Sequence, residues 1–261
     1  MKYFIHLAYK GTAYQGWQRQ ANGLGVQEVL EKQLAKMFKQ KVGLHACGRT
    51  DAGVHASQFF CHTIIEKNWN FDAVFRINKM LPSDIKVLEF IPVVNQANAQ
   101  LDVIARTYDY YIHLHESPFL SELSTYYLIE KSTLGEMQQA ASLIKNYNDF
   151  RSFCKQPDLY PTTICQITKS ELSINAAQTQ LRFRITGNRF LKAMVRMLVG
   201  NLVKIGQGKL TLADFIEMLE NPRLTTVPSF AYPQGLYLSK VVYPYLERAN
   251  AQHLCSFSDS F

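Results

Sequence analysis

The first hundred residues alternate between strand-like and helix-like patterns of apolar side chains. Apolar residues occupy every second position from Tyr3 to Tyr9, which is typical of a half-buried strand. They then recur at helical spacing between Val26 and Phe38, which predicts a helix. A second strand is expected over residues 55–65, and a short helix and a strand near Val87 complete this part of the chain.

The rest of the chain repeats this order in outline. Strands are predicted over residues 107–114, 166–174 and 181–186. Thr133 and Glu136 have the spacing of a capping box, which predicts that a helix begins there. Two further helices and a last strand are expected to follow.

A polar segment, residues 95–100, has no hydrophobic periodicity and separates the two series of elements. We therefore predict two halves that each mix strands with helices, one over residues 1–100 and one over residues 101–261. A chain of 261 residues with 47% apolar residues is long enough to bury a large core.

One helix is predicted to begin near Asn188 and to have two contrasting faces. Its apolar face consists of Leu191, Met194, Val195, Leu198 and Leu202. Its other face is a basic ridge that consists of Arg189, Lys192, Arg196 and Lys204. A solvated helix face is the ordinary explanation for such charges. No acidic residue interrupts the ridge before Asp214, which favours contact with phosphate groups.

The strand before this helix adds two more cations. Arg182 and Arg184 alternate with apolar residues and point outward if Leu181, Phe183 and Ile185 face the core. We expect both arginines to extend the basic surface. The formal net charge of +7 agrees with a polyanionic partner, although many proteins that bind no nucleic acid carry a similar excess.

Cysteine and histidine spacing predicts neither disulfides nor a metal site. The five cysteines form no C-x-x-C pair, which is typical of reduced thiols in the cytoplasm. His113, His115 and Glu116 lie close in sequence but lack a further ligand at a recognisable spacing. No stretch approaches the roughly 18 apolar residues of a membrane-spanning helix, so we expect a soluble, cytoplasmic protein with no membrane partner.

The segment GRTDAGVHA, residues 48–56, places the carboxylate of Asp51 beside the guanidinium of Arg49. Asp followed by Gly is good turn chemistry, so a simple turn is one explanation. A site built around one nucleophilic carboxylate is the other, because an aspartate is already an anion at neutral pH. His55, in the same segment, is expected to pack or to orient its neighbours.

The segment ARTYDYYI, residues 105–112, interleaves aromatic rings with charge. In a strand, Arg106, Tyr108 and Tyr110 share one face, where a tyrosine ring can stack on a nucleobase. Packing within the sheet is the ordinary role of a strand tyrosine. Both roles remain open at this point.

Together these residues carry a family resemblance. The matching segments are YKGTAYQGWQ (residues 9–18), GRTDAGVHA (48–56), LPSDIKV (81–87), ARTYDYYI (105–112), NDFRSFCK (148–155), NRFLKAMVR (188–196) and GLYL (235–238). In content and order they resemble the tRNA pseudouridine synthase A family. The resemblance extends over nearly the whole chain, and GRTDAGVHA is its most specific segment.

The resemblance implies that a uridine of tRNA loses its glycosidic bond and is rejoined to its ribose through carbon 5, with no cofactor. Asp51 corresponds to the nucleophile, and the resemblance does not decide whether it attacks the sugar or the base. Arg196 would pair with this carboxylate, Tyr108 would lie against the target base and could serve in proton removal, and Arg49 would hold the base out of the helix. Extrusion is needed because a stacked uridine hides its reacting atoms.

The same resemblance implies a fold and partners. The fold would be α/β of the α+β type, with two ferredoxin-like halves whose sheets join around a central active-site cleft. The substrate would be the anticodon arm of tRNA at uridines 38 to 40, bound across a homodimer. Arg106, Arg182, Arg184, Arg189 and Lys192 would contact the RNA.

Five positions depart from the usual family pattern, and two other functional classes remain to be weighed. The departures are Lys10, Gln100, Asn148, Gln166 and Tyr232, where Asp, Arg, His, Arg and Pro are usual. One alternative is a catalytically silent or retargeted RNA-binding paralogue. The other is a different carboxylate enzyme, but an aspartic protease needs a second catalytic Asp and an aspartyl phosphatase needs magnesium ligands such as D-x-D.

Overall fold

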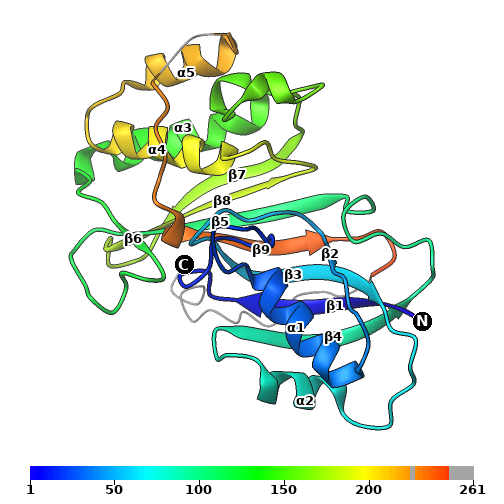
Figure 1. The fold of residues 1–261 in the computed structure, drawn as a ribbon. Helices are drawn as coiled ribbons and strands as arrows, with labels where there is room; N and C mark the ends of the chain where they lie inside the picture. The colour runs from blue at the N-terminus through cyan, green and yellow to red at the C-terminus, as the bar shows by residue number, and fades with distance from the viewer. Residues whose placement is uncertain (224–226, 247–261) are drawn as a thin grey trace. The chain divides into compact units, whose positions relative to one another are not determined.

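The computed structural model describes residues 1–223 and 227–246, and its contacts divide the chain into two compact units. The first unit contains residues 1–104 and 237–246, and the second contains residues 105–236 (Figure 1). Both combine antiparallel strands with helices, so the predicted α/β fold class is confirmed. The assignment of separate functional halves to residues 1–100 and 101–261 stays a prediction.

The first unit is built on a sheet with strand order β4-β1-β3-β9. Its elements are β1 (Lys2–Tyr9), α1 (Val26–Phe38), β2 (His45–Ala46), β3 (His55–Ile64), α2 (Ala73–Met80), β4 (Ile85–Val93) and β9 (Leu236–Val242). β1 pairs antiparallel with both β3 and β4, and β9 pairs parallel with β3. β2 is a short antiparallel addition to β3. The last described strand therefore returns to the first unit.

Helices α1 and α2 lie against one face of this sheet (Figure 1). The apolar positions that predicted α1 are buried, including Val26, Leu30 and Leu34, and the helix ends where Lys39 adopts a left-handed conformation. α2 begins at Asp72, whose Oδ1 accepts a hydrogen bond of 2.9 Å from the N–H of Phe75.

The prediction that the first strand is half-buried is wrong. Phe4 and His6, on the face of β1 opposite Ile5 and Leu7, are also buried. The ring of Phe4 packs against Tyr243 at 5.2 Å, because the chain after β9 covers this second face. The periodicity of one strand does not reveal that residues distant in sequence, such as Tyr243, will bury its second face.

The second unit is built on the antiparallel sheet β5-β8-β7, to which β6 adds a short parallel pairing with β5. Its elements are β5 (Ala105–His113), β6 (Thr125–Tyr126), α3 (Leu134–Leu143), β7 (Ile167–Ile174), β8 (Gln180–Gly187), α4 (Met194–Gly206) and α5 (Leu212–Glu220). Short 3-10 turns occur at Lys131–Thr133, Ile144–Asn146, Arg151–Phe153, Pro157–Leu159 and Pro233–Gly235. α3 packs on β7, and α4 and α5 pack on α3 (Figure 1).

The predicted capping box at Thr133 is wrong. The Thr133 hydroxyl donates to the carbonyl oxygens of Glu130 and Gly206, at 2.7 and 2.9 Å, and makes no cap on α3. A 3-10 turn, Lys131–Thr133, runs directly into the helix and removes the extended conformation that a capping residue needs. A capping box is present instead at α5, between Thr211 and Asp214.

The helix predicted from Asn188 begins later, at Met194. Ala193, directly before it, has a φ of 61°, so residues 188–193 form a turn. Arg189 and Lys192 therefore do not share a helical ridge with Arg196 and Lys204, and that predicted ridge is wrong. The apolar face of α4 itself is buried as predicted.

In the described part of the chain, no helix is long and apolar enough to cross a membrane. The cysteines described there, Cys47, Cys61, Cys154 and Cys165, are buried free thiols. Cys255 lies outside the described residues.

Candidate active site

Asp51 lies on an exposed turn of the first unit, immediately before β3. The N–H of Val54 donates to the Asp51 carbonyl oxygen at 3.2 Å, and Gly53 takes a φ of 76°. Asp51 and Arg49 are exposed, whereas Thr50 between them is buried. The Asp51 carboxylate and the Arg49 guanidinium are therefore exposed to solvent, while the buried Thr50 between them fixes the turn to the core.

A second segment, residues 9–17, holds this turn through several hydrogen bonds. The hydroxyl of Tyr9 lies 2.8 Å from Oγ1 of Thr50, and both side chains are buried. The N–H of Trp17 donates to the Thr50 carbonyl oxygen at 3.3 Å, and the N–H of Gly53 donates to the Tyr14 carbonyl oxygen at 3.2 Å. Because these bonds flank Asp51 on both sides, they fix the backbone that carries the carboxylate.

Two glycines allow the segments to approach so closely. A Cβ at Gly16 would lie 2.4 Å from the Thr50 carbonyl oxygen, and Gly16 also has a φ of 84°. A Cβ at Gly11 would lie 2.0 Å from the Val54 carbonyl oxygen. The Gly11 N–H donates to Nδ1 of His55 at 2.9 Å, so His55 orients this contact, as predicted.

In the second unit, Tyr108 and Arg106 lie on one face of β5. The ring of Tyr108 meets the ring of Phe190 edge-on at 5.1 Å. The Arg106 guanidinium donates to the Asn188 carbonyl oxygen at 3.2 Å. The turn of residues 188–193 therefore packs over both side chains and fixes their orientation.

Arg196 extends from the first turn of α4 toward a group of aromatic residues. Its Nε donates to the Ala231 carbonyl oxygen at 2.8 Å, and its guanidinium lies 5.9 Å from the ring centre of Phe230. Burial raises the pKa of Tyr110 and of Tyr127, and the positive charge of Arg196 opposes both shifts. Arg196 is thus a fixed cation beside two neutral tyrosines.

The segment that follows Ala231 completes this group. Tyr110 is buried, its hydroxyl donates to the Tyr232 carbonyl oxygen at 2.8 Å, and its oxygen lies 3.0 Å from Oγ1 of Thr125. The Tyr232 N–H donates to the Tyr127 hydroxyl at 3.1 Å. A proline, usual at position 232 in the family that the sequence resembles, has no N–H and could not make this bond.

The histidines near the end of β5 have a structural environment. His113 is buried, and its Nδ1 lies 2.8 Å from Oγ of Ser124. Burial and the neighbouring His115 lower the pKa of His113. Within residues 1–223 and 227–246, no three His, Cys, Asp or Glu side chains form a group that could hold a metal ion.

Comparisons with known proteins match these segments over most of the chain. A family model described as tRNA pseudouridine synthase matches residues 144–244. A tRNA pseudouridine synthase A from Porphyromonas gingivalis is 40% identical over 93% of this chain and 97% of its own length. The chain belongs to the tRNA pseudouridine synthase A family. A protein of that name from Bacteroides fragilis is 38% identical over 93% of this chain and 96% of its own length. Another from Staphylococcus aureus (strain Newman) is 34% identical over 92% of this chain and 90% of its own length.

Within the tRNA pseudouridine synthase A fold, the residues predicted for catalysis fall into two groups. Asp51 and Arg49 belong to one turn of the first unit, and Tyr108 and Arg196 belong to β5 and α4 of the second. Each group is locally ordered by the contacts described above. The catalytic roles of these four residues stay predictions.

The expectation that Arg182 and Arg184 point outward is wrong for Arg182 and only partly met for Arg184, whose side chain is 24% exposed. Arg182 is buried, and Arg184 forms a bidentate ion pair with the buried carboxylate of Asp109, at 2.7 and 2.9 Å. The pair raises the pKa of Arg184. Alternation along β8 places both arginines on the face of the sheet opposite Phe183 and predicts that solvent covers that face. Asp109 of β5 lies on the same face and pairs with Arg184.

Arg189 and Lys192 lie on the turn before α4, against residues 156–160. The Lys192 N–H donates to the Tyr160 hydroxyl at 3.1 Å, and its Nζ donates to Gln156 Oε1 at 3.1 Å. The Arg189 guanidinium lies 5.9 Å from the Tyr160 ring centre. Their assignment to RNA binding stays a prediction.

Several residues that shape the site were not singled out from the sequence. Tyr9, Thr50 and Gly16 hold the Asp51 turn, Phe190 packs against Tyr108, and Tyr127 is near enough to Arg196 for its charge to oppose the rise of the Tyr127 pKa. Tyr9 and Gly16 do lie in YKGTAYQGWQ, so their presence in a family segment was the available signal.

Proposed function

We propose that this protein converts uridine to pseudouridine in the anticodon arm of tRNA, at uridines 38 to 40, with Asp51 as the nucleophile. Isomerisation of a tRNA uridine is the activity of the family to which the chain belongs. The observation that supports the residue-level proposal is the Asp51 turn, where an exposed carboxylate stands on a backbone fixed from a neighbouring segment.

The reaction consumes no co-substrate because uridine and pseudouridine contain the same atoms. The bond from N1 of the base to C1′ of the ribose breaks, and a bond from C5 to C1′ forms. The proton on C5 leaves to solvent, and N1 gains a proton. A nucleophilic carboxylate stabilises the detached intermediate by a temporary covalent bond and is released at the end.

Four side chains share the work in this proposal. Asp51 attacks, and Arg196 supplies positive charge to that carboxylate when RNA is bound. Tyr108 lies against the extruded base and serves in removal of the C5 proton. Arg49 holds the uridine outside the RNA stack, which exposes the reacting atoms.

Arg106, Arg189 and Lys192 bind the RNA backbone in this proposal. Phosphate contacts position an RNA without reading its sequence, so these residues would set affinity and register. We also propose that the protein acts as a homodimer. Sedimentation velocity with and without tRNA measures this state directly, and a monomer that is active at the concentrations of the assay would contradict the dimer.

Tritium release from tRNA labelled at uridine C5 tests the chemistry. Wild-type protein is expected to release tritium, whereas Asp51→Ala and Asp51→Asn release none above background and still bind tRNA within a few-fold of wild type. Glu66→Gln is a matched control, because it removes one exposed carboxylate elsewhere in the first unit. Turnover by either Asp51 variant would overturn the nucleophile assignment.

Mapping of pseudouridine in the product tests the position. We expect the modified residues at 38, 39 and 40 and none in a tRNA whose uridines there are replaced by cytidine. Product at another position would refute the target while preserving the reaction. Binding of tRNA with no release by the wild type would identify a silent paralogue.

A further inference from the structure

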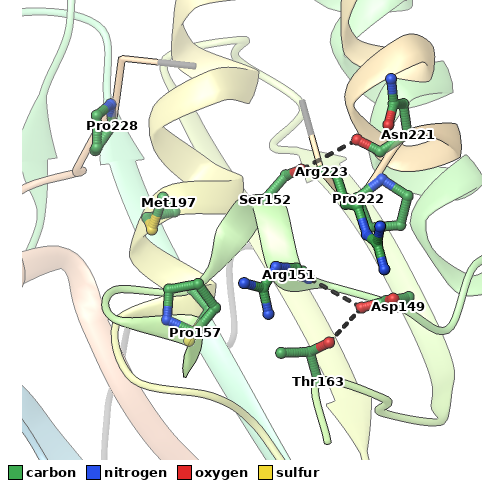
Figure 2. A pocket seen from close by; sticks show the side chains of 11 residues that line it. Asp149, Arg151, Ser152, Pro157, Thr163, Met197, Asn221, Pro222, Arg223 and Pro228 are labelled. Carbon is green, nitrogen blue, oxygen red and sulfur yellow. Dashed lines mark hydrogen bonds between the residues drawn. The ribbon is translucent and has the colours of Figure 1, made fainter. Parts of the chain in front are cut away.

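The segment NDFRSFCK, residues 148–155, belongs to the family pattern but has no role in the chemistry proposed above. It lines a cavity of about 930 Å³ in the second unit (Figure 2). The residues around this cavity are Asp149, Arg151, Ser152, Cys154, Pro157, Thr163, Met197, Asn221, Pro222, Arg223 and Pro228. Two arginines from distant parts of the sequence thus meet at one cavity.

The segment is anchored by its aromatic residues, which leaves its polar residues at the cavity. Phe150 and Phe153 are fully buried, and Phe153 packs against Phe215 of α5 at 5.8 Å. The Ser152 hydroxyl donates to the Asn221 carbonyl oxygen at 3.3 Å. Arg151 is therefore held at the cavity by a 3-10 turn fixed on both sides.

The carboxylate of Asp149, at the cavity, accepts hydrogen bonds from nearby residues of the protein. Asp149 Oδ1 accepts hydrogen bonds from the Thr163 hydroxyl at 2.5 Å and from the Arg151 N–H at 3.2 Å. Figure 2 shows both bonds, with the Arg151 side chain between Asp149 and Pro157. The guanidinium of Arg151 itself is held by Asp158 in an ion pair.

This ion pair is exchangeable. The Asp158 side chain is 83% exposed and that of Arg151 is 36% exposed, so solvent screens their attraction. A phosphodiester carries the same single negative charge as a carboxylate and offers the guanidinium two oxygens for a bidentate contact, whereas Asp158 meets it through Oδ1 alone. Arg223, exposed at the same cavity, adds a second guanidinium from the turn that follows α5.

The cavity also adjoins the cations proposed to hold RNA. The Lys155 N–H donates to the Lys192 carbonyl oxygen at 3.1 Å, so the end of the cavity segment lies against the turn that carries Lys192 and Arg189. Gln156 and Tyr160, on the same loop as Pro157, contact these two cations. An RNA strand that follows Arg189 and Lys192 would therefore pass the cavity.

We propose that this cavity binds a phosphodiester of the RNA backbone, at a nucleotide other than the one that reacts, with Arg151 and Arg223 as its ligands. The proposal rests on the proposed tRNA substrate. Charge, cavity size and the adjoining cations favour a nucleic-acid phosphate. The chemistry at Asp51 does not depend on it, so the two can be separated by experiment.

Salt-dependent tRNA binding tests the site with Arg151→Gln and Arg223→Gln. Each variant is expected to bind tRNA about 5- to 10-fold more weakly at low salt, and to lower the slope of log affinity against log salt by about 1. Turnover at saturating tRNA should stay at the wild-type rate. Asp158→Asn is expected to change binding in the opposite direction, tightening it about twofold, because it removes the competing carboxylate.

Arg76→Gln is the matched control, since Arg76 is an exposed arginine on α2 that stacks on Phe71. It should leave affinity and slope unchanged. Unchanged affinity and slope in both cavity variants, beside normal binding and turnover by the wild type, would overturn the phosphate site and leave the proposed function intact. A wild-type protein that binds no tRNA would refute both. Thermal unfolding checks each variant, and Arg223→Gln decides alone if Arg151→Gln does not fold.

Discussion

The hydroxyl of Tyr9 lies 2.8 Å from Oγ1 of Thr50, inside the first unit, and joins β1 to the residue directly before Asp51. Both side chains are buried, so water does not compete for this hydrogen bond. Strand β1 is paired on both sides and is therefore a firm support. Asp51 gains its fixed position from a strand about forty residues away in sequence.

Tyr9→Phe is expected to lower turnover more than binding. Loss of this hydrogen bond should cost about 1 kcal/mol of stability and loosen the Asp51 turn. A small displacement of a catalytic group reduces turnover about 10-fold or more, while tRNA affinity, which depends on other residues, stays near that of the wild type. Single-turnover tritium release and filter binding measure the two quantities separately.

Tyr3→Phe is the control for this change, because it removes a hydroxyl from the same face of the same strand, away from the turn. Thr50→Ser keeps the hydroxyl and should retain most of the activity. Equal losses of affinity and turnover in Tyr9→Phe would mean that the bond supports the fold as a whole.

Gly16→Ala is expected to be more severe. The added Cβ would meet the Thr50 carbonyl oxygen at 2.4 Å, and the φ of 84° is unfavourable for any residue with a side chain. We expect a stability loss of about 2 kcal/mol or more and little turnover at 25 °C. Urea unfolding and tritium release measure these effects.

Gly43→Ala provides the matched control, since nothing lies within 4 Å of a Cβ there. It should leave both stability and turnover unchanged. Normal turnover in Gly16→Ala would show that the close approach of the two segments is dispensable for catalysis.

The sequence predicted the Asp51 turn well because its residues are adjacent, but it did not reveal what holds the turn. The partnership of Tyr9 with Thr50 depends on strand pairing between β1 and β3, which a single sequence does not display. The start of α4 was missed for a different reason. Leu191 is buried in a turn as it would be in a helix, and an alanine at position 193 gives no sign of a left-handed conformation.

Burial of charge was likewise hidden from the sequence. Arg184 looked solvent-facing by alternation, yet Asp109 lies opposite it on β5, as the register of the two strands requires. A cross-strand partner is visible only when the register is known.

Arg184→Gln is expected to destabilise the fold. The substitution leaves the carboxylate of Asp109, which is 1% exposed, without its bidentate partner. Removal of one member of a buried pair costs about 3 kcal/mol. Chemical denaturation measures the free energy of unfolding, and tRNA binding by the folded fraction should match the wild type.

Lys169→Gln is the control, because Lys169 and Glu171 form an ion pair of 2.8 Å with side chains 50% and 40% exposed. Its loss should cost less than about 0.5 kcal/mol. A stable Arg184→Gln variant with weak tRNA binding would reverse our conclusion and restore Arg184 as an RNA contact.

His62 is expected to make stability depend on pH between about 4 and 6.5. Its Nδ1 accepts the Ala99 N–H at 3.0 Å, and burial, with Lys2 and His45 nearby, lowers the pKa of His62 to about 4 despite the opposing charge of Asp102. Below pH 6.5, His62 is therefore protonated in the unfolded chain, whereas in the folded chain it stays neutral until the pH falls to about 4. Its contribution to stability is present above pH 6.5 and is lost as the pH falls through this window.

His62→Asn isolates this contribution, because an asparagine oxygen can accept the Ala99 N–H and does not titrate. The free energy of unfolding of the variant should fall less steeply than that of the wild type between pH 6.5 and pH 4. His45→Asn, at the exposed neighbour that stacks on His62 at 5.0 Å, removes one of the smaller causes of the lowered His62 pKa and should therefore reduce the slope much less than His62→Asn does. Identical slopes for wild type and His62→Asn would mean that His62 accepts a proton in the folded state as readily as in the unfolded chain.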